Sequence, residues 1–217
     1  MGRVRRREDQ FPYSVVQTVV QASRGRVLLS NVTDPYQPIE ETYELTKKML
    51  KTLVRHPCPV SILTKSSLVL RDLDLLRRFH DCEVGFTITT LNDDIKRCFE
   101  SNASPTEERL NTLKVLHDGG VSTFAFSGPL LPFLVEEFLE GLARRFRAVG
   151  VRWVLVDRLN IKSGNWRTIQ RALETHYPEL VPHYEHALFH GTDYFDDLKR
   201  KVAKHLRAEG VSFTFCY

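Results

Sequence analysis

Residues 27–66 read VLLSNVTDPYQPIEETYELTKKMLKTLVRHPCPVSILTKS and hold one complete strand–helix–strand unit. The apolar run Val27–Val32 predicts a buried strand. Residues 41–55 follow with leucine and methionine at four-residue spacing, which predicts an amphipathic helix. A second apolar run at 60–63 predicts the next strand. A strand, a helix and a strand in this order indicate a right-handed βαβ unit with two parallel strands.

The same alternation continues to the end of the chain. Further apolar runs predict strands at Val84–Thr89, Val121–Phe126, Val151–Val156 and Val211–Cys216. Helical spacing predicts helices at 71–79, 93–99, 105–117, 134–146, 166–176, 184–189 and 193–207. Ser104-Pro105-Thr106-Glu107 has the pattern of a capping box, with the proline at the first helical position.

This rhythm predicts an α/β fold with a parallel sheet, which is either a partial (β/α)6 barrel or an open doubly wound sheet. No glycine-rich phosphate loop follows any predicted strand. That absence disfavours a dinucleotide-binding open sheet.

The sequence before residue 25 departs from the alternation. Four arginines fall within the first seven residues, as in a solvated tail or an arm that contacts phosphates. Four valines between positions 15 and 20 lie at helical spacing, so we expect the first βα unit of the series to be missing. The predicted divisions are a tail and helix at 1–24, a partial barrel at 25–160, and a helical extension with a closing strand at 161–217.

Composition bounds the class of protein. Apolar residues make up 42% of the 217 residues, which is enough for a packed core and argues against disorder. The net charge of +4 is too small to require a nucleic-acid partner. No apolar run reaches the roughly 18 residues of a membrane span, and no apolar stretch follows the first arginines as in a secretory signal. We therefore expect a cytoplasmic protein without membrane contact.

Metal-ligating residues are scattered. The four cysteines are Cys58, Cys82, Cys98 and Cys216. They include no C-x-x-C pair, so neither a zinc knuckle nor a sequence-local cluster site is expected. His183, His186 and His190 share one helical side without a carboxylate at ligand spacing, so we interpret them as surface histidines. The sequence predicts no metal site.

Polar side chains follow the predicted strands, at the end where parallel α/β sheets place their chemistry. These candidates are Thr33, Asp34, Lys65, Thr87, Thr89, Ser127, Asp157, Arg158 and Asn160. Each also has a structural explanation, as a turn former, a strand former or half of an ion pair. Together, carboxylates, an ammonium group and several hydroxyls suit a zwitterionic small molecule such as an amino acid.

Three segments carry a more specific likeness. TDPYQP at 33–38 with Glu40, TKS at 64–66 and RDLDLL at 71–76 resemble the spore photoproduct lyase-like group of radical S-adenosylmethionine proteins, often labelled DNA repair photolyase-like. The likeness extends over nearly all of the chain from Val27 onward. Its weaker pieces are Thr87–Thr90, Arg109-Leu110, Gly119-Gly120, Pro129–Pro132, Arg158–Asn160, Gly164–Trp166 and Phe215–Tyr217.

This resemblance implies a partial barrel with S-adenosylmethionine and a 4Fe-4S cluster at its open mouth, where reductive cleavage of the cofactor yields a 5′-deoxyadenosyl radical. It implies that Thr33 and Asp34 hold the methionine amino group and that Lys65 pairs with the carboxylate. Thr87 and Thr89 would offer further hydroxyls. The substrate is not implied, because a fold and a cofactor do not fix it. Candidates to face it are Ser127, Asp157, Arg158 and Asn160.

The chain departs from this family in one respect: the C-x-x-x-C-x-x-C motif that ligates the cluster is absent. The leading hypothesis is a truncated radical S-adenosylmethionine protein, inactive as given, with an unknown substrate and nucleic acid suggested by the family label alone. A second is a non-catalytic domain that binds a small molecule or a partner, because the exposed edge at Val27–Val32 invites strand addition by a partner or a second copy. A third, a cluster-independent barrel enzyme, has no nucleophile–base pair in its favour.

Overall fold

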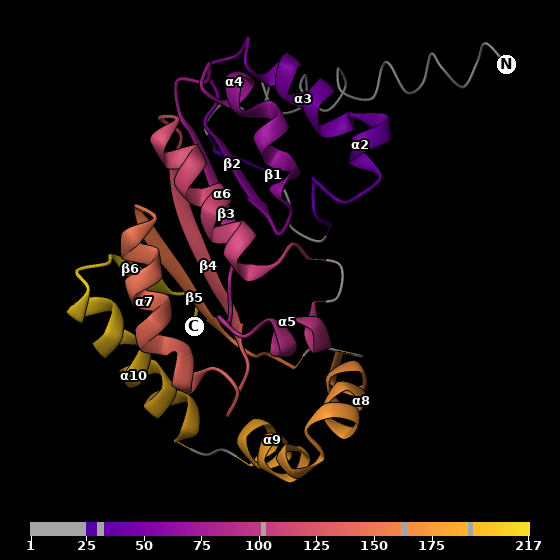
Figure 1. Ribbon diagram of the computed structural model, residues 1–217, viewed down its shortest axis with the longest axis vertical. Helices are drawn as coiled ribbons and strands as arrows, with labels where there is room; N and C mark the ends of the chain where they lie inside the picture. Colours follow the sequence, from indigo (N-terminus) through magenta and orange to yellow (C-terminus); the bar gives the residue numbers. More distant parts are fainter. Residues whose placement is uncertain (1–24, 30–32, 101–102, 162–164, 191–192) are drawn as a thin grey trace, which may run out of the picture.

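The computed structural model describes residues 25–29, 33–100, 103–161, 165–190 and 193–217. Its centre is a parallel sheet with the strand order β1-β2-β3-β4-β5-β6 (Figure 1). The strands are β1 Val27–Leu29, β2 Val60–Thr64, β3 Cys82–Thr87, β4 Ser122–Leu130, β5 Trp153–Arg158 and β6 Phe213–Phe215. The predicted six-stranded parallel α/β sheet is confirmed. In the described residues β1 and β6 do not pair, so the sheet is open and the barrel stays a prediction.

Helices connect the strands. They are α2 Glu40–Tyr43, α3 Leu45–Leu53, α4 Leu73–Leu76, α5 Asp93–Phe99, α6 Thr106–Asp118, α7 Leu139–Ala148, α8 Asn165–His176, α9 Val181–Phe189 and α10 Tyr194–Ala208. The described part of the chain also contains three 3-10 helices, which precede α4, α7 and α9: η1 Ser67–Asp72, η2 Glu136–Phe138 and η3 Pro178–Leu180. The helix expected at 1–24 lies outside the described residues, as do the last three residues of the first predicted strand.

The segment 41–55, expected to form one helix, contains parts of two helices, α2 and α3. The single helix predicted over 41–55 is wrong, because Glu44 adopts the left-handed conformation, with φ of 51°, between α2 and α3. The carboxylate of Glu40 accepts hydrogen bonds from the backbone amides of Thr46 (3.0 Å) and Lys47 (3.2 Å). A side chain of α2 therefore caps the first turn of α3, which a continuous helix would not allow.

The predicted capping box is also wrong. Helix α6 begins at Thr106, and Pro105 lies before it with an extended ψ of 148°. The amide of Thr106 donates to Asp93 Oδ1 at 3.0 Å, while Ser104 Oγ accepts from the amide of Ser67 at 3.3 Å. The Asp93 carboxylate of α5 thus caps α6, and Ser104 instead accepts a hydrogen bond from the segment after β2.

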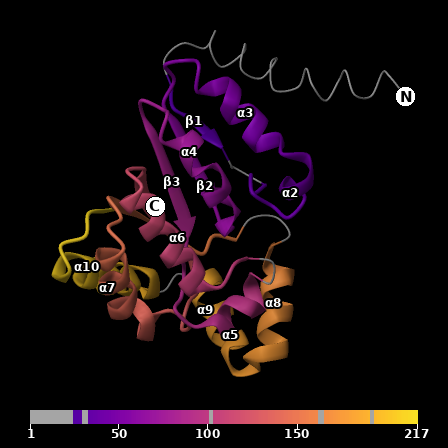
Figure 2. The ribbon, with the colours of Figure 1, turned by 45° about the horizontal axis from the view of Figure 1, so that its top comes forward.

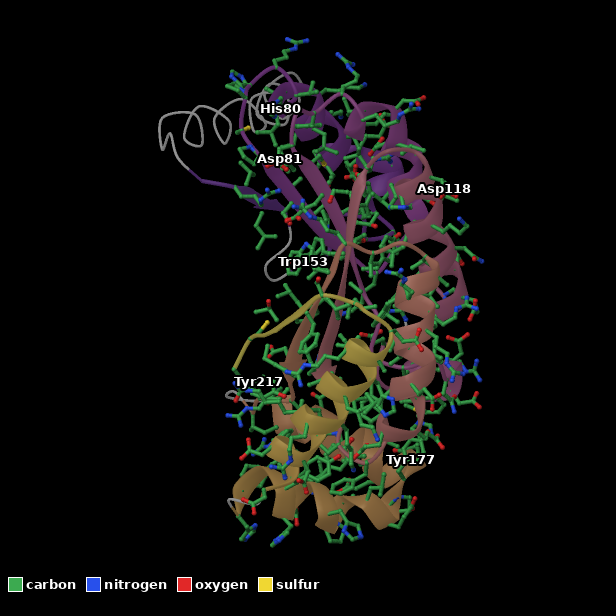
Figure 3. All side chains as sticks on the ribbon, turned by 90° about the vertical axis from the view of Figure 1, so that its left-hand side faces the viewer. His80, Asp81, Asp118, Trp153, Tyr177 and Tyr217 are labelled. Atoms are coloured by element: carbon green, nitrogen blue, oxygen red, sulfur yellow. The ribbon has the colours of Figure 1, made fainter. Side chains whose placement is uncertain are left out.

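The sheet has one helix-covered face. Residues in register on neighbouring strands point to the same side, and Thr64, Phe86, Ala125 and Val154 form one fully buried row. Helix α6 packs against β3 and β4, and α10 packs against α7. In Figure 3 Trp153 lies on the other side of the sheet from α6 and α7.

That other face is filled at its centre by aromatic rings. Phe124 and Trp153 stack with centroids 4.9 Å apart and an interplanar angle of 14°. A Cβ atom at Gly85 would lie 2.2 Å from the ring of Phe124, so the glycine makes room for this pair. Helices α5, α8 and α9 gather at the carboxyl end of the strands in both Figure 1 and Figure 2.

Candidate functional site

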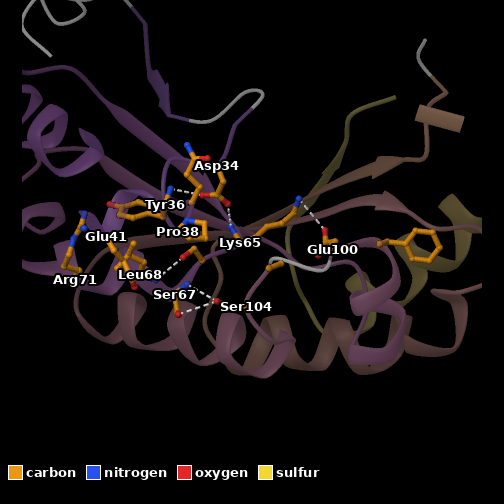
Figure 4. Close-up of a pocket in the computed structure, with 14 residues that line it drawn as sticks. Asp34, Tyr36, Pro38, Glu41, Lys65, Ser67, Leu68, Arg71, Glu100 and Ser104 are labelled. Carbon is orange, nitrogen blue, oxygen red and sulfur yellow. Dashed lines mark hydrogen bonds and ion pairs between the residues drawn. The ribbon is translucent and has the colours of Figure 1, made fainter. Parts of the chain in front are cut away.

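Asp34 joins the carboxyl ends of β1 and β2. Its Oδ1 accepts hydrogen bonds from the Tyr36 amide at 2.9 Å and the Thr64 hydroxyl at 2.6 Å. Its Oδ2 accepts from the Lys65 amide at 2.7 Å (Figure 4). Three donors therefore fix the carboxylate, and an ionised carboxylate retains acceptor capacity beyond them. The sequence candidates Asp34 and Lys65 are brought together, although the contact is made by the backbone of Lys65.

The Lys65 side chain points away from Asp34 toward Glu100, which follows α5 (Figure 4). Lys65 Nζ lies 3.5 Å from Glu100 Oε1, and its side chain is 42% exposed. The other oxygen of Glu100 accepts from Arg109 Nη1 at 3.0 Å. Arg109 is 1% exposed, and the same nitrogen donates to the Thr87 carbonyl at 2.6 Å. One carboxylate is thus shared between an accessible cation and a buried one.

These groups open onto a cleft of about 980 Å³. Its lining comes from the loop after β1 and the start of α2, from η1 and the residues before it, and from the end of α5 and the residues that precede α6. The lining residues are Asp34, Tyr36, Gln37, Pro38, Glu41, Lys65, Ser66, Ser67, Leu68, Arg71, Phe99, Glu100, Ala103 and Ser104. A carboxylate, an ammonium group and hydroxyls in one cleft suit a zwitterion.

A largely buried network at the edge of this cleft joins Tyr36, Glu40, Arg71 and Asp72. Tyr36 donates its hydroxyl to Asp72 Oδ2 at 3.2 Å. Arg71 donates to Asp72 at 2.9 and 3.1 Å and to Glu40 Oε1 at 2.9 Å. Burial first, and then the Asp72 carboxylate, raises the pKa of Tyr36 far above its usual value. These residues shape the loop that carries Asp34.

The three threonine candidates are dispersed. Thr33 is exposed and lines a second cavity, of about 550 Å³, which also touches Asp34. Thr87 ends β3 in register with Phe126, and its side chain is buried. Thr89 is buried two residues further on. Neither Thr87 nor Thr89 is among the residues that line the 980 Å³ cleft.

The four substrate candidates fall in different places. Ser127 is buried and in register with Val156, so it points toward the helices. Asp157 lies against Gly128, where an added Cβ would come within 2.8 Å of the Asp157 Cβ. Arg158 lies over the rings of Phe195 and Tyr217, at 5.5 and 5.3 Å.

Asn160 shares a cavity with Arg158 but not with Asp34. This cavity of about 380 Å³ lies between the end of β5 and residues of α9 and α10. The Asn160 carbonyl accepts from the Asn165 side chain at 2.9 Å. Arg158, at the end of β5, and Asn160, which follows it, therefore lie apart from the cleft at β1 and β2.

Sequence reasoning missed Glu100 and Arg109 as parts of the site. The signal for Arg109 was a cation on the apolar side of α6, in line with Thr106 and Leu113, both of which are buried. Arginine is almost never buried without a partner, so this position calls for a carboxylate nearby. The sequence did not indicate which carboxylate that would be, because Glu100 reaches it through the fold.

The cysteines do not assemble. All four are free, and in the described parts of the chain no group of three His, Cys, Asp or Glu side chains could hold a metal ion. Burial first, and then Asp81 and Glu83, raises the pKa of Cys82 to about 12. These residues do not fit the three-thiolate ligand set of an iron–sulfur cluster.

Sequence comparison finds relatives that are longer than this chain. No family model matches. An uncharacterized protein of Methanocaldococcus jannaschii is 36% identical over 157 residues, which cover 72% of this chain and 58% of that one. An uncharacterized protein of Mycobacterium tuberculosis H37Rv is 28% identical over 83% of this chain and 56% of its own. The chain spans a little over half the length of these relatives.

A more distant relative has a functional name. A protein of Pseudomonas phage M6, named radical SAM Nalpha-GlyT isomerase, is 27% identical over 128 residues. The aligned part covers 58% of this chain and 27% of the phage protein.

Solved structures show the fold. Spore photoproduct lyase complexed with dinucleoside spore photoproduct superposes with a TM-score of 0.65 and 14% identity, over 97% of this chain and 66% of that one. The chain has the fold of spore photoproduct lyase. A mutant of that enzyme with bound AdoMet and dinucleoside spore photoproduct gives a TM-score of 0.64. Streptococcus suis SuiB bound to S-adenosylmethionine gives 0.54, at 11% identity, over 88% of this chain and 38% of SuiB.

Within the described ranges, every helix is too short or too polar to cross a membrane.

Proposed function

We propose that this chain is a binding domain for S-adenosylmethionine, and that the amino-acid end of the cofactor lies in the 980 Å³ cleft. The observation that carries the proposal is the pairing of a fixed carboxylate, Asp34, with an accessible ammonium group, Lys65, at the ends of neighbouring strands. The shared fold of AdoMet-bound structures supports it.

Each group has a distinct task in this proposal. Asp34, held by three donors, would accept the ligand's amino group on its remaining lone pairs. Lys65 would pair with the ligand's carboxylate, which must compete with Glu100 for the amine. Thr33 lies beside Asp34 and would contact the same amino group. Thr87, at the end of β3, and Thr89, two residues after it, remain proposed contacts.

A calorimetric titration with S-adenosylmethionine tests the assignment. Lys65→Ala should weaken binding about tenfold, since hydrogen bonds to charged groups contribute ~1.5–3 kcal/mol. The backbone amide that binds Asp34 is retained, so the change removes only the ammonium group. Lys51→Ala, on the exposed side of α3, serves as the matched control. Equal affinity in the Lys65 and Lys51 variants would remove Lys65 from the site.

Radical chemistry is not assigned to this chain alone. The cluster that the family uses needs three thiolates, and the cysteines at 58, 82, 98 and 216 do not provide them. This observation favours a non-catalytic domain that binds a small molecule or a partner over a radical enzyme. Anaerobic reconstitution with iron and sulfide separates the candidates. Stoichiometric binding of a cluster by this chain would contradict the non-catalytic proposal.

A truncated origin is proposed on the same ground. Sequencing the source DNA upstream of the Met1 codon tests it. An in-frame C-x-x-x-C-x-x-C motif would support a longer radical enzyme that cleaves S-adenosylmethionine reductively. A stop codon with no such motif would contradict it. We also propose a cytoplasmic location and, on the family label alone, a nucleic-acid substrate.

A further inference from the structure

Phe133 has a strained backbone in the loop that follows β4. Its φ is 63°, in the left-handed region that a bulky side chain rarely adopts. Its ring is 38% exposed, and the loop leaves the carboxyl end of β4, where parallel sheets place their ligands. Such a conformation persists only where surrounding contacts impose it. Specific contacts must therefore hold this aromatic residue at the rim of the sheet.

Tyr194 and Glu136 supply such contacts. The Phe133 amide donates a hydrogen bond to Tyr194 Oη at 2.7 Å. The Tyr194 hydroxyl donates in turn to Glu136 Oε1, and the rings of Phe133 and Tyr194 lie 4.4 Å apart between centroids. Glu136 begins η2 and Tyr194 begins α10, so two elements that are distant in the sequence together fix the strained amide.

Two polar atoms beside these contacts are closed off from solvent and have no hydrogen-bond partner among the described residues. They are Glu136 Oε2 and Tyr184 Oη, which belongs to α9. Tyr184 is fully buried, and its ring lies 6.0 Å from the Phe133 ring. Buried polar atoms in native proteins are nearly always bonded to protein or to ordered water, because an unbonded one retains the full cost of its desolvation. Both atoms therefore require a partner.

The chemistry of the two groups specifies that partner. Burial first, and then Tyr194 and Glu136, raises the pKa of Tyr184 far above its usual value, so its hydroxyl stays protonated and the three side chains are neighbours. An ionised Glu136 carboxylate can only accept. A water molecule accepts from the hydroxyl, donates to the carboxylate, and is small enough for a place without access from solvent. An anion would be repelled by the carboxylate.

We propose that a buried water molecule links Tyr184 Oη to Glu136 Oε2. This water completes a latch, formed by Glu136, Tyr184 and Tyr194, which joins η2, α9 and α10 and holds Phe133 at the rim of the sheet. None of the three latch residues lines the 980 Å³ cleft. The inference is therefore independent of S-adenosylmethionine binding.

Urea unfolding of a variant that lacks one hydroxyl tests the water by the sign of the effect. Tyr184→Phe removes the hydroxyl and keeps the buried ring. Because the bound water then loses a hydrogen bond, the equilibrium constant for unfolding should rise about fivefold. If the hydroxyl has no partner, its removal relieves an unsatisfied group, and a variant that is equally or more stable would overturn the proposal. Tyr43→Phe, at a tyrosine of α2 that is 48% exposed, is the matched control and should unfold like the parent.

Two further measurements separate the latch from general stability. Hydrogen exchange of residues 131–138, followed by mass spectrometry, should speed up in Tyr184→Phe by more than that of β2 and β3, and an equal change in all three segments would contradict the latch. A high-resolution crystal structure of the parent chain needs no variant. Density for a water within about 3.2 Å of both atoms is expected. An empty place, or a direct hydrogen bond between the two side chains, would overturn the proposal.

Discussion

Glu100 divides its carboxylate between Lys65 at 3.5 Å and the buried Arg109 at 3.0 Å. A ligand carboxylate at Lys65 has to displace one of these interactions. Glu100→Gln keeps an acceptor for Arg109 and removes the competing charge, so affinity for S-adenosylmethionine should rise severalfold.

Glu100→Ala should instead lower the free energy of unfolding by about 3 kcal/mol, because Arg109 loses its carboxylate inside the protein. Calorimetric titration and urea unfolding measure the two effects, and weaker binding by Glu100→Gln would contradict the competition.

Arg71 neutralises two buried carboxylates, Glu40 and Asp72, which are 3% and 2% exposed. Arg71→Ala should cost ~3–5 kcal/mol of stability, because both charges lose their partner away from water. Arg97→Ala breaks an exposed pair with Asp94 and should cost under ~0.5 kcal/mol. Urea unfolding of both variants provides the comparison. Similar midpoints would mean that the Arg71 network contributes no more than a surface pair.

Cys82 should be the least reactive thiol that the fold holds in place. Burial raises the pKa of Cys82 from a usual value near 9 to about 12. At pH 8 the fraction of thiolate at Cys82 is therefore about a thousandfold smaller than at a thiol with the usual pKa. Alkylation of Cys82 should therefore lag behind that of the half-exposed Cys98, as peptide mass spectrometry can show. The raised pKa also predicts the direction in which stability changes with pH. The stability that the protonated thiol contributes is complete below pH 9 and is lost as the pH rises toward 12. Equal alkylation rates at both cysteines would contradict the assignment.

At the scale of elements, β3, β4 and β5 are joined on one face by a glycine and two rings. Gly85→Ala would bring a Cβ atom to 2.2 Å from the Phe124 ring and push it against Trp153. We expect a loss of ~1–3 kcal/mol in the free energy of unfolding, as for overpacked cores. Gly25→Ala is the control, because no heavy atom of the described residues beyond its chain neighbours lies within 4 Å of the added carbon.

The same element-scale contact predicts its own rescue. Gly85→Ala combined with Phe124→Ala should lose less than the sum of the single losses, because the clash is gone. Thermal unfolding of the four proteins measures this coupling. Strict additivity would show that the glycine is needed for another reason.

At the scale of the whole molecule, the sheet could be predicted because parallel strands that are covered by helices have nearly continuous apolar sequences. Residues 60–63 and 93–99 illustrate this, since β2 and α5 lie where the runs and spacings place them. The break at Glu44 could not be predicted, because it depends on Glu40 and on the distant Arg71. The prediction from local spacing also failed at Ser104, because the Asp93 carboxylate of α5 accepts the hydrogen bond from the first amide of α6.

The candidate site was likewise predicted only in part from the sequence. Asp34 and Lys65 could be placed together, because each follows a strand and the two strands are neighbours. Glu100 could not, since it reaches Lys65 from a third segment after α5. The residues after β5 were expected beside Asp34, but Arg158 and Asn160 line a different cavity. Their position depends on helices α9 and α10, which no strand pattern locates.

The order of the strands in the sheet equals their order in the chain. During synthesis each strand leaves the ribosome after the neighbour it will pair with is already available, so no strand waits for one still to be translated. Partly made chains can then bury apolar surface one βα unit at a time. At each stage the newest strand forms one edge of the growing sheet, and the outer edge of β1 stays unpaired within the described residues. Mispairing between nascent chains is thus confined to these two edges.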